Sequence, residues 1–153
     1  MHFRSVLMRL LFCCALLRMA GSVAFALSES TTLAALRDHA RPLLIFSPSA
    51  GDPRLLEQLK ILRAQAGDAA ERDLVAIAIP EGGDAPSEDK FSEAEANRAR
   101  RRFHIGAGEF LVVLVGKDGG EKLRSPKPIP FEKLRSVIDS MPMRREEMKG
   151  KAK

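Results

Sequence analysis

Two serine hydroxyls, at Ser47 and Ser49, lie in a short loop between a predicted strand and a predicted helix. Hydroxyls at a helix start can hydrogen-bond an anion together with the free backbone amides of the first turn. Asp52 follows in the same loop, and its carboxylate would repel an anion. We therefore favour turn formation and helix capping for these residues, with anion binding as the alternative.

The densest positive run of the chain, Arg98 with residues 100–102, is a candidate surface for an anionic partner. In a helix Arg98, Arg101 and Arg102 share one side, where they could contact lipid headgroups, a polyanion or a protein. Acidic residues on the same predicted helix favour the alternative, a solvated face with internal ion pairs. These residues are Glu88, Glu93 and Glu95.

Three further basic residues, Lys117, Arg124 and Arg144, are candidates for a similar contact. Lys117 lies in Gly116–Gly120, which superficially resembles a phosphate loop, but the flanking strands favour a hairpin turn. Arg144 stands beside methionines that could instead close the core.

No catalytic, metal or cofactor site is predicted. His39 and His104 are far apart and have no carboxylates at zinc-ligand spacing. No Ser, His and acid grouping has the context of a nucleophile elbow.

The amino terminus has the features of a secretory signal peptide. Two arginines precede an apolar run over residues 10–17, and the Ala-Phe-Ala triplet at 24–26 fits the cleavage rule. We therefore predict a signal peptide at 1–26 and an exported protein, periplasmic or secreted. Both cysteines, Cys13 and Cys14, lie within it, so the mature chain would contain no thiol.

The charge balance gives little reason to expect a nucleic-acid partner. The 153 residues include 25 Lys and Arg against 20 Asp and Glu, a formal net charge of +5. Removal of the three arginines in the signal peptide lowers this to +2. At this length we predict one domain, over 27–142, and a charged, frayed tail over 143–153.

Apolar runs and chain breakers predict eight elements in the order α-β-α-β-α-β-β-α. The expected strands are 43–46, 73–80, 109–116 and 121–125, and the expected helices are 28–41, 52–66, 88–103 and 131–141. Helical crossovers between buried strands imply parallel pairing, and the last two strands form an antiparallel hairpin. The predicted fold class is α/β, a thioredoxin-like mixed four-stranded sheet flanked by helices.

Four stretches carry a family resemblance: Arg41–Ser49, Asp52–Leu55, Glu109-Phe110 with Gly116–Gly120 and Lys122, and Ile138–Met148 with its Met-Pro-Met-Arg-Arg segment. On these stretches, over about residues 33–148, the chain resembles the bacterial branch of the family called domain of unknown function 4174. The resemblance implies a thioredoxin-like domain, also found in animal extracellular-matrix and sushi-repeat proteins. It brings no catalytic residue with it.

In thioredoxin-like enzymes a nucleophilic cysteine follows the first strand at a helix start, and here that loop has no thiol. Gly108-Glu109 stands before the third strand, where redox relatives have a proline that binds substrate backbone. Thiol-disulfide chemistry is thus excluded for the mature chain. The leading hypothesis is a non-catalytic binding module, whose partner is an envelope protein or an anionic polymer or lipid. The alternatives are a thioredoxin- or peroxiredoxin-related enzyme that works without cysteine, and a binder of anionic lipid or polysaccharide.

Overall fold

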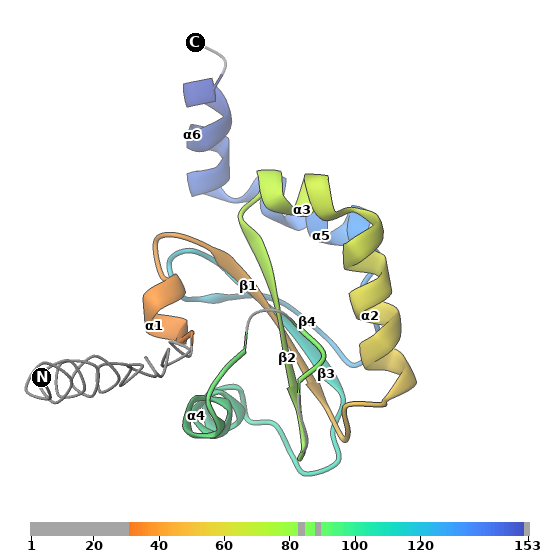
Figure 1. The fold of residues 1–153 in the computed structure, drawn as a ribbon. Coiled ribbons are helices and arrows are strands. Elements are labelled where there is room, and N and C mark those ends of the chain that lie inside the picture. Colours follow the sequence, from red (N-terminus) through yellow and green to blue (C-terminus); the bar gives the residue numbers. More distant parts are fainter. Residues whose placement is uncertain (1–30, 83–84, 88–89, 152–153) are drawn as a thin grey trace, which may run out of the picture.

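The computed structural model describes residues 31–82, 85–87 and 90–151 (Figure 1). The predicted signal peptide at 1–26 lies outside the described residues. None of the helices in the described ranges combines the length and the hydrophobicity that a membrane span requires.

A mixed four-stranded sheet forms the centre of the molecule, as predicted (Figure 1). Its strands are β1 (Arg41–Ser47), β2 (Leu74–Pro80), β3 (Leu111–Val115) and β4 (Glu121–Ser125), in the order β2-β1-β3-β4. The β1–β2 pair is parallel, and the β3–β4 pair is antiparallel.

The direction of β3 differs from the expectation, because β3 runs antiparallel to β1. A crossover helix gives a parallel strand only when it returns the chain to the opposite end of the sheet. Here α4 (Glu93–Phe103) stays near the carboxyl end of β2, where Arg100 Nη2 donates to the Ile79 carbonyl at 2.7 Å. The chain therefore enters β3 from the end at which it left β2.

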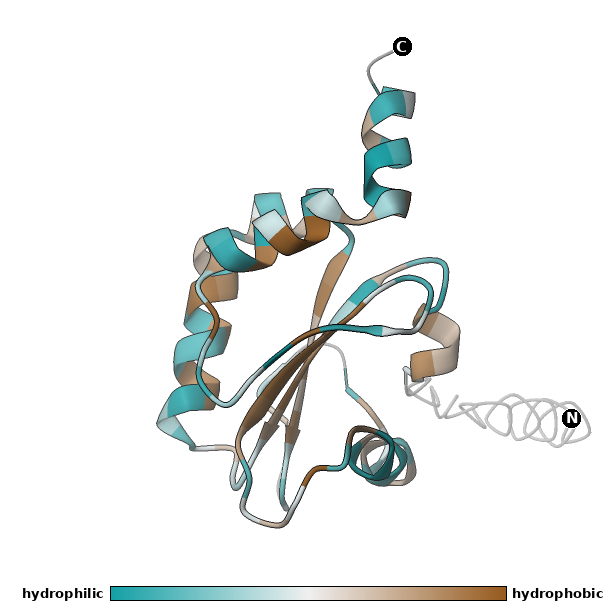
Figure 2. Ribbon diagram, turned by 180° about the vertical axis from the view of Figure 1, so that it is seen from behind, coloured by the Kyte–Doolittle hydropathy of each residue, from teal (hydrophilic) through white to brown (hydrophobic). Residues whose placement is uncertain are grey.

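Helices cover both faces of the sheet, which explains why β1 and β3 are buried along their whole length. On one face, α2 (Pro53–Ala64), α3 (Ala66–Glu71) and α5 (Phe131–Ser140) pack against alternate strand residues such as Leu43 and Ile45. On the other face, α1 (Leu33–Leu36) and α4 cover Leu44 and Phe46. Figure 2 shows the apolar strands between helices whose outer sides are hydrophilic.

The helix boundaries follow capping residues. The Asp52 side chain accepts from the Arg54 amide at 2.8 Å and starts α2, with Pro53 at its first position, as predicted. Ser92 caps α4 in the same way, so this helix begins five residues later than expected. The predicted first helix is a single turn, and the predicted second helix breaks at Gln65 into α2 and α3.

The expectation of a frayed carboxyl-terminal tail is wrong. Met141 ends α5, and Pro142 then begins a further helix, α6 (Pro142–Lys151). Proline fits this position because it has no amide hydrogen, and the amides of a first helical turn have no acceptor within the helix. Arg144 on this helix is 1% exposed. Tertiary contacts hold this helix, and its charged composition does not predict them.

Candidate functional site

The loop that begins α2 has its polar groups engaged with one another. The buried Ser47 hydroxyl donates to the Ser49 carbonyl at 2.9 Å, and Ser49 itself is exposed. Arg54 Nη2 lies 2.7 Å from Asp52 Oδ2, and its hydrogen bonds lower the pKa of the Asp52 carboxyl. An ionised carboxylate thus occupies the helix start where an anion would have to bind, which agrees with the capping interpretation.

The arginines of α4 point to different places. Arg98 pairs with Glu95 at 2.7 Å, as the ion-pair interpretation expected. Arg102 Nη2 donates to the Gly119 carbonyl at 2.6 Å. Arg101 is exposed, and its side chain has no hydrogen bond or ion pair in the described part of the chain. The structure therefore brings Arg98 and Arg102 to one surface and leaves Arg101 outside it.

That surface is an open groove between α1, α4 and the turn Gly116–Gly120 that joins β3 to β4. We call it the arginine groove, after Arg37, Arg98 and Arg102 on its rim. Its volume of about 900 Å³ is in the range of ligand sites. Apolar side chains form its floor: Leu33, Leu36, Pro42, Ala99 and Val115.

Two guanidinium groups of the arginine groove meet at Gly119. A Cβ placed on Gly119 would lie 3.9 Å from Arg102 Nη2 and 3.9 Å from Arg37 Nε, so both side chains approach one point. Gly119 has φ of 79°, a conformation that favours glycine, and this turn exposes its carbonyl to Arg102. Neither arginine has a carboxylate partner among the described residues. Two like charges therefore share a surface without an internal counterion.

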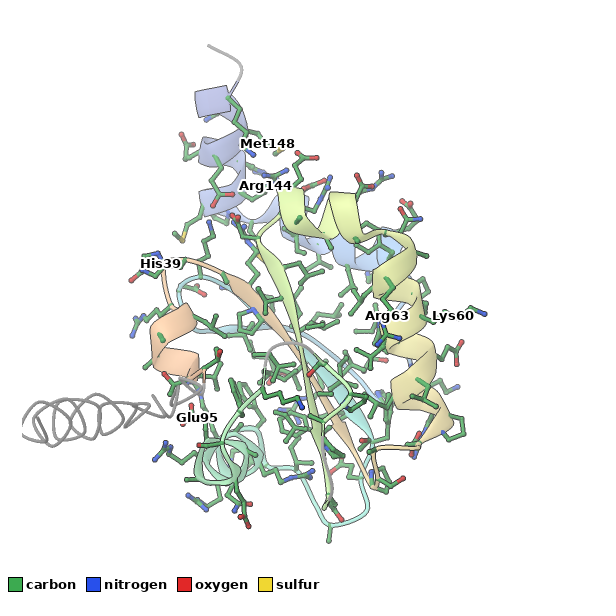
Figure 3. All side chains as sticks on the ribbon, viewed as in Figure 1. His39, Lys60, Arg63, Glu95, Arg144 and Met148 are labelled. Carbon is green, nitrogen blue, oxygen red and sulfur yellow. The ribbon has the colours of Figure 1, made fainter. Side chains whose placement is uncertain are left out.

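The carboxylates of the groove are already paired. Glu95 is 7% exposed, accepts from the Leu33 amide at 3.0 Å and binds Arg98, so it also fastens α1 to α4 (Figure 3). Asp118 pairs with Lys122, whose hydrogen bond lowers the pKa of the Asp118 carboxyl. Arg37 and Arg102 thus remain as the uncompensated charges of this surface.

Lys117 and Arg144 come together elsewhere, at the amino-terminal end of β1. They belong to a group of four cations and four carboxylates that we call the ion cluster. Its members are Arg41, Arg72, Lys117, Arg144, Glu71, Asp73, Asp139 and Glu147. Because the charges balance, the cluster offers no excess charge to a ligand.

Arg144 joins α6 to α3 and α5 within the ion cluster (Figure 3). Its guanidinium donates to Glu71 Oε1 at 2.8 Å, to the Glu71 carbonyl at 3.1 Å and to Asp139 Oδ1 at 3.3 Å. Lys117 Nζ donates to Asp73 Oδ2 and to Glu147 Oε1, both at 2.8 Å. Both candidates therefore face inward and have internal partners.

Arg124 lies apart from both surfaces, on the edge strand β4. Its guanidinium pairs with Glu121 at 2.8 Å and donates to the Phe103 carbonyl at 2.9 Å. His39 and His104 are exposed, and no group of His, Cys, Asp or Glu within residues 31–82, 85–87 and 90–151 could hold a metal ion.

A family model described as a domain of unknown function, DUF4174, matches residues 32–147. The chain belongs to the DUF4174 family. Its region of match includes both the arginine groove and the ion cluster up to Glu147. A search of curated proteins found no match.

Solved structures similar to this DUF4174 chain include redox proteins. A reduced 2-Cys peroxiredoxin of Plasmodium vivax has 12% identity and a TM-score of 0.56, over 76% of this chain and 84% of that one. A thioredoxin peroxidase of Plasmodium yoelii has 14% identity and a TM-score of 0.56, over 74% and 79%. An exposed lipoprotein thioredoxin of Streptococcus pneumoniae has 12% identity and a TM-score of 0.50, over 71% and 90%. At these identities the likeness confirms the thioredoxin-like fold alone.

Two residues at these surfaces of the DUF4174 chain, Arg37 and Glu147, were not among the candidates predicted from the sequence. Arg37 lies 61 residues before Arg98, and only the packing of α1 on α4 brings them to one groove. Glu147 lies in the stretch expected to fray. The Met-Pro-Met-Arg-Arg segment was the available signal for an ordered carboxyl end, since it carried the resemblance.

Proposed function

We propose that this protein is a non-catalytic binding module that holds an anionic group of a partner in the arginine groove. The observation that carries the proposal is the meeting of Arg37 and Arg102 at Gly119 without a carboxylate partner among the described residues. Guanidinium groups bind carboxylate, sulfate and phosphate oxygens through paired hydrogen bonds. A ligand anion would supply the missing counterion.

The groove favours a ligand with an anionic group attached to a less polar body. Leu33 and Leu36 remain partly exposed on the floor beside the arginine rim. The groove is open along its length, which suits a segment of a polymer or a lipid better than an enclosed small molecule. Anionic polysaccharide and lipid of a bacterial envelope have this chemistry.

The export of the protein belongs to the same proposal. Support comes from the sequence, where a positive start, an apolar run and the Ala-Phe-Ala triplet at 24–26 precede the domain. Expression of the full chain in a bacterium should give a periplasmic or secreted product that begins at Leu27, measured by intact mass. A full-length product that stays in the cytoplasm would contradict export.

Charge reversal tests the groove. The Arg102→Glu variant should bind fluorescein-labelled dextran sulfate at least roughly tenfold more weakly than wild type, because a charge-assisted contact becomes a repulsion. Arg101→Glu makes the same charge change on the same helix outside the groove, and it should have a smaller effect. Fluorescence anisotropy measures both, with circular dichroism to verify folding. Equal losses in the two variants would mean that net charge alone controls binding.

Phosphatidylglycerol vesicles form the second arm and separate lipid from polymer. Retention of wild type on these vesicles, lost in Arg102→Glu, would favour a lipid ligand, whereas binding to dextran sulfate alone favours a polymer. The rival enzyme hypothesis is tested with insulin and hydrogen peroxide as substrates. Turnover by thiol-free protein that persists after further purification would overturn the non-catalytic role.

A further inference from the structure

The turn Gly116–Gly120 has one side on the arginine groove and the other on the ion cluster. Asp118, Gly119 and Gly120 line the groove. Lys117 extends the other way, is 11% exposed in its side chain, and ends between two carboxylates of the ion cluster. The turn is closed by the Gly119 amide, which donates to the Gly116 carbonyl at 2.8 Å. A displacement of Lys117 would therefore move the groove side of the turn as well.

Lys117 is also connected to the other arginine-bearing element. The Asp38 amide donates to the Lys117 carbonyl at 2.9 Å. Asp38 has φ of 66°, a conformation that is uncommon for a residue other than glycine, and it follows Arg37 directly. This hydrogen bond fixes the backbone next to Arg37 against the turn that presents Gly119. Both guanidinium groups at Gly119 thus depend on the place of one lysine.

A single residue of α6 completes the surroundings of that lysine. Glu147 Oε1 accepts from Lys117 Nζ at 2.8 Å and from Arg41 Nη2 at 2.9 Å. Arg41 is 1% exposed, and the only other carboxylate that it pairs with among the described residues is Asp73, whose Oδ2 lies 3.7 Å from Arg41 Nη1. Asp73 Oδ2 already accepts a hydrogen bond from Lys117 Nζ. Without Glu147, Arg41 and Lys117 would compete for Asp73, because a buried guanidinium requires a counterion.

We propose that Glu147 is a positioning residue for the arginine groove, which acts through Lys117 on the turn and on the backbone beside Arg37. The proposal rests on the proposed function, since it assigns to α6 the control of that same site. Docked α6 keeps Arg37 and Arg102 converged at Gly119, and release of α6 separates them. The carboxyl-terminal helix is then a regulatory element for ligand binding.

Three variants of α6 test this positioning. Glu147→Gln removes the charge and keeps the shape, and Glu146→Gln is its matched control, since Glu146 is exposed and pairs with Lys149 on the same helix. We expect Glu147→Gln to weaken dextran sulfate binding roughly fivefold or more, Glu146→Gln to leave it unchanged, and Glu147→Asp to restore part of it. Equal binding by Glu147→Gln and wild type would overturn the proposal.

A double-mutant cycle separates positioning from general loss of stability. In an Arg37→Ala background, Glu147→Gln should have a smaller further effect than in wild type, because the route through Arg37 is already removed and only the route through the turn remains. A full additive loss in that background would contradict the route through Arg37. If Glu147→Gln does not fold, Lys117→Met breaks the same contact from the turn, and the same pattern is expected.

Amide hydrogen exchange gives a readout that needs no ligand. Glu147→Gln should accelerate exchange of the Asp38 and Gly119 amides, while Glu146→Gln leaves them as in wild type. If wild type binds neither probe, the proposed function fails, and the exchange rates still decide the coupling. Unchanged exchange at both amides in Glu147→Gln would overturn the coupling even where binding is real.

Discussion

The arginine groove and the ion cluster use the same residue type for different purposes. The ion cluster balances its four cations with four carboxylates and buries Arg41 and Arg144 to 1% exposure. The groove leaves Arg37 and Arg102 at the surface with no carboxylate among the described residues. A buried guanidinium surrounded by carboxylates contributes to the fold, and an exposed guanidinium without a carboxylate partner is available to a ligand. Positive charge in the sequence therefore marks function only after its partners are known.

Removal of the Arg144 guanidinium should destabilise the protein most and tests whether the ion cluster holds the fold. Arg144→Ala should lower the free energy of unfolding by about 3 kcal/mol, because it removes the buried guanidinium that donates to Glu71 and Asp139 and leaves an empty volume in its place. Urea denaturation measures this, with m-values to verify that unfolding remains two-state. The control is Arg145→Ala, an exposed neighbour that should change stability by less than about 0.5 kcal/mol. A loss as small as that of the control would mean that α6 does not depend on the cluster.

The pH dependence of stability gives the next largest effect. Burial opposes ionisation of Glu147, but hydrogen bonds from Arg41 and Lys117 prevail and lower its pKa from 4.5 to about 2. A carboxyl with a lowered pKa stabilises the fold fully above pH 4.5, and this contribution is lost as the pH falls from 4.5 to 2. Its size at neutral pH is on the order of 2 kcal/mol after allowance for partial exposure.

The Glu147→Gln variant isolates that contribution. Over the interval from pH 4.5 to 2, wild type should lose stability more steeply than the variant, while both should have flat profiles near neutrality. Glu146→Gln, as control, should follow wild type. Thermal melting across this range measures the difference. Parallel profiles for Glu147→Gln and wild type would mean that Glu147 has the same pKa in the folded and unfolded states.

Local rules predicted the elements that depend on neighbouring residues. Unbroken apolar runs indicated three buried strands, and the Asp52-Pro53 pair indicated the start of α2. Both could be predicted because strand burial and helix capping depend on residues only a few positions apart. The direction of β3 was not predicted, since it depends on the end of the sheet at which the chain leaves α4 and enters β3. α6 was missed because its residues are mostly charged, and its stability comes from contacts with α3, β1 and the turn. The groove was found only in part, because Arg37 reaches it through tertiary packing.

Arg98 combines a feature of the arginine groove with a feature of the ion cluster. It lies on the groove, as the uncompensated arginines do, and it pairs with the buried Glu95, as the cluster arginines pair with carboxylates. Its side chain is 60% exposed, so water screens the pair, but Arg98→Ala leaves the 9% exposed Glu95 side chain without a cation. The variant should therefore cost about 1 kcal/mol of stability, less than Arg144→Ala. The same change should weaken dextran sulfate binding only about two- to threefold, less than Arg102→Ala, because Glu95 already neutralises Arg98. Paired urea and anisotropy measurements on the two variants test this order. A stronger loss of binding in Arg98→Ala than in Arg102→Ala would show that an arginine can bind the ligand even while it pairs with a carboxylate. The difference between the two regions would then depend on burial of the guanidinium rather than on counterions.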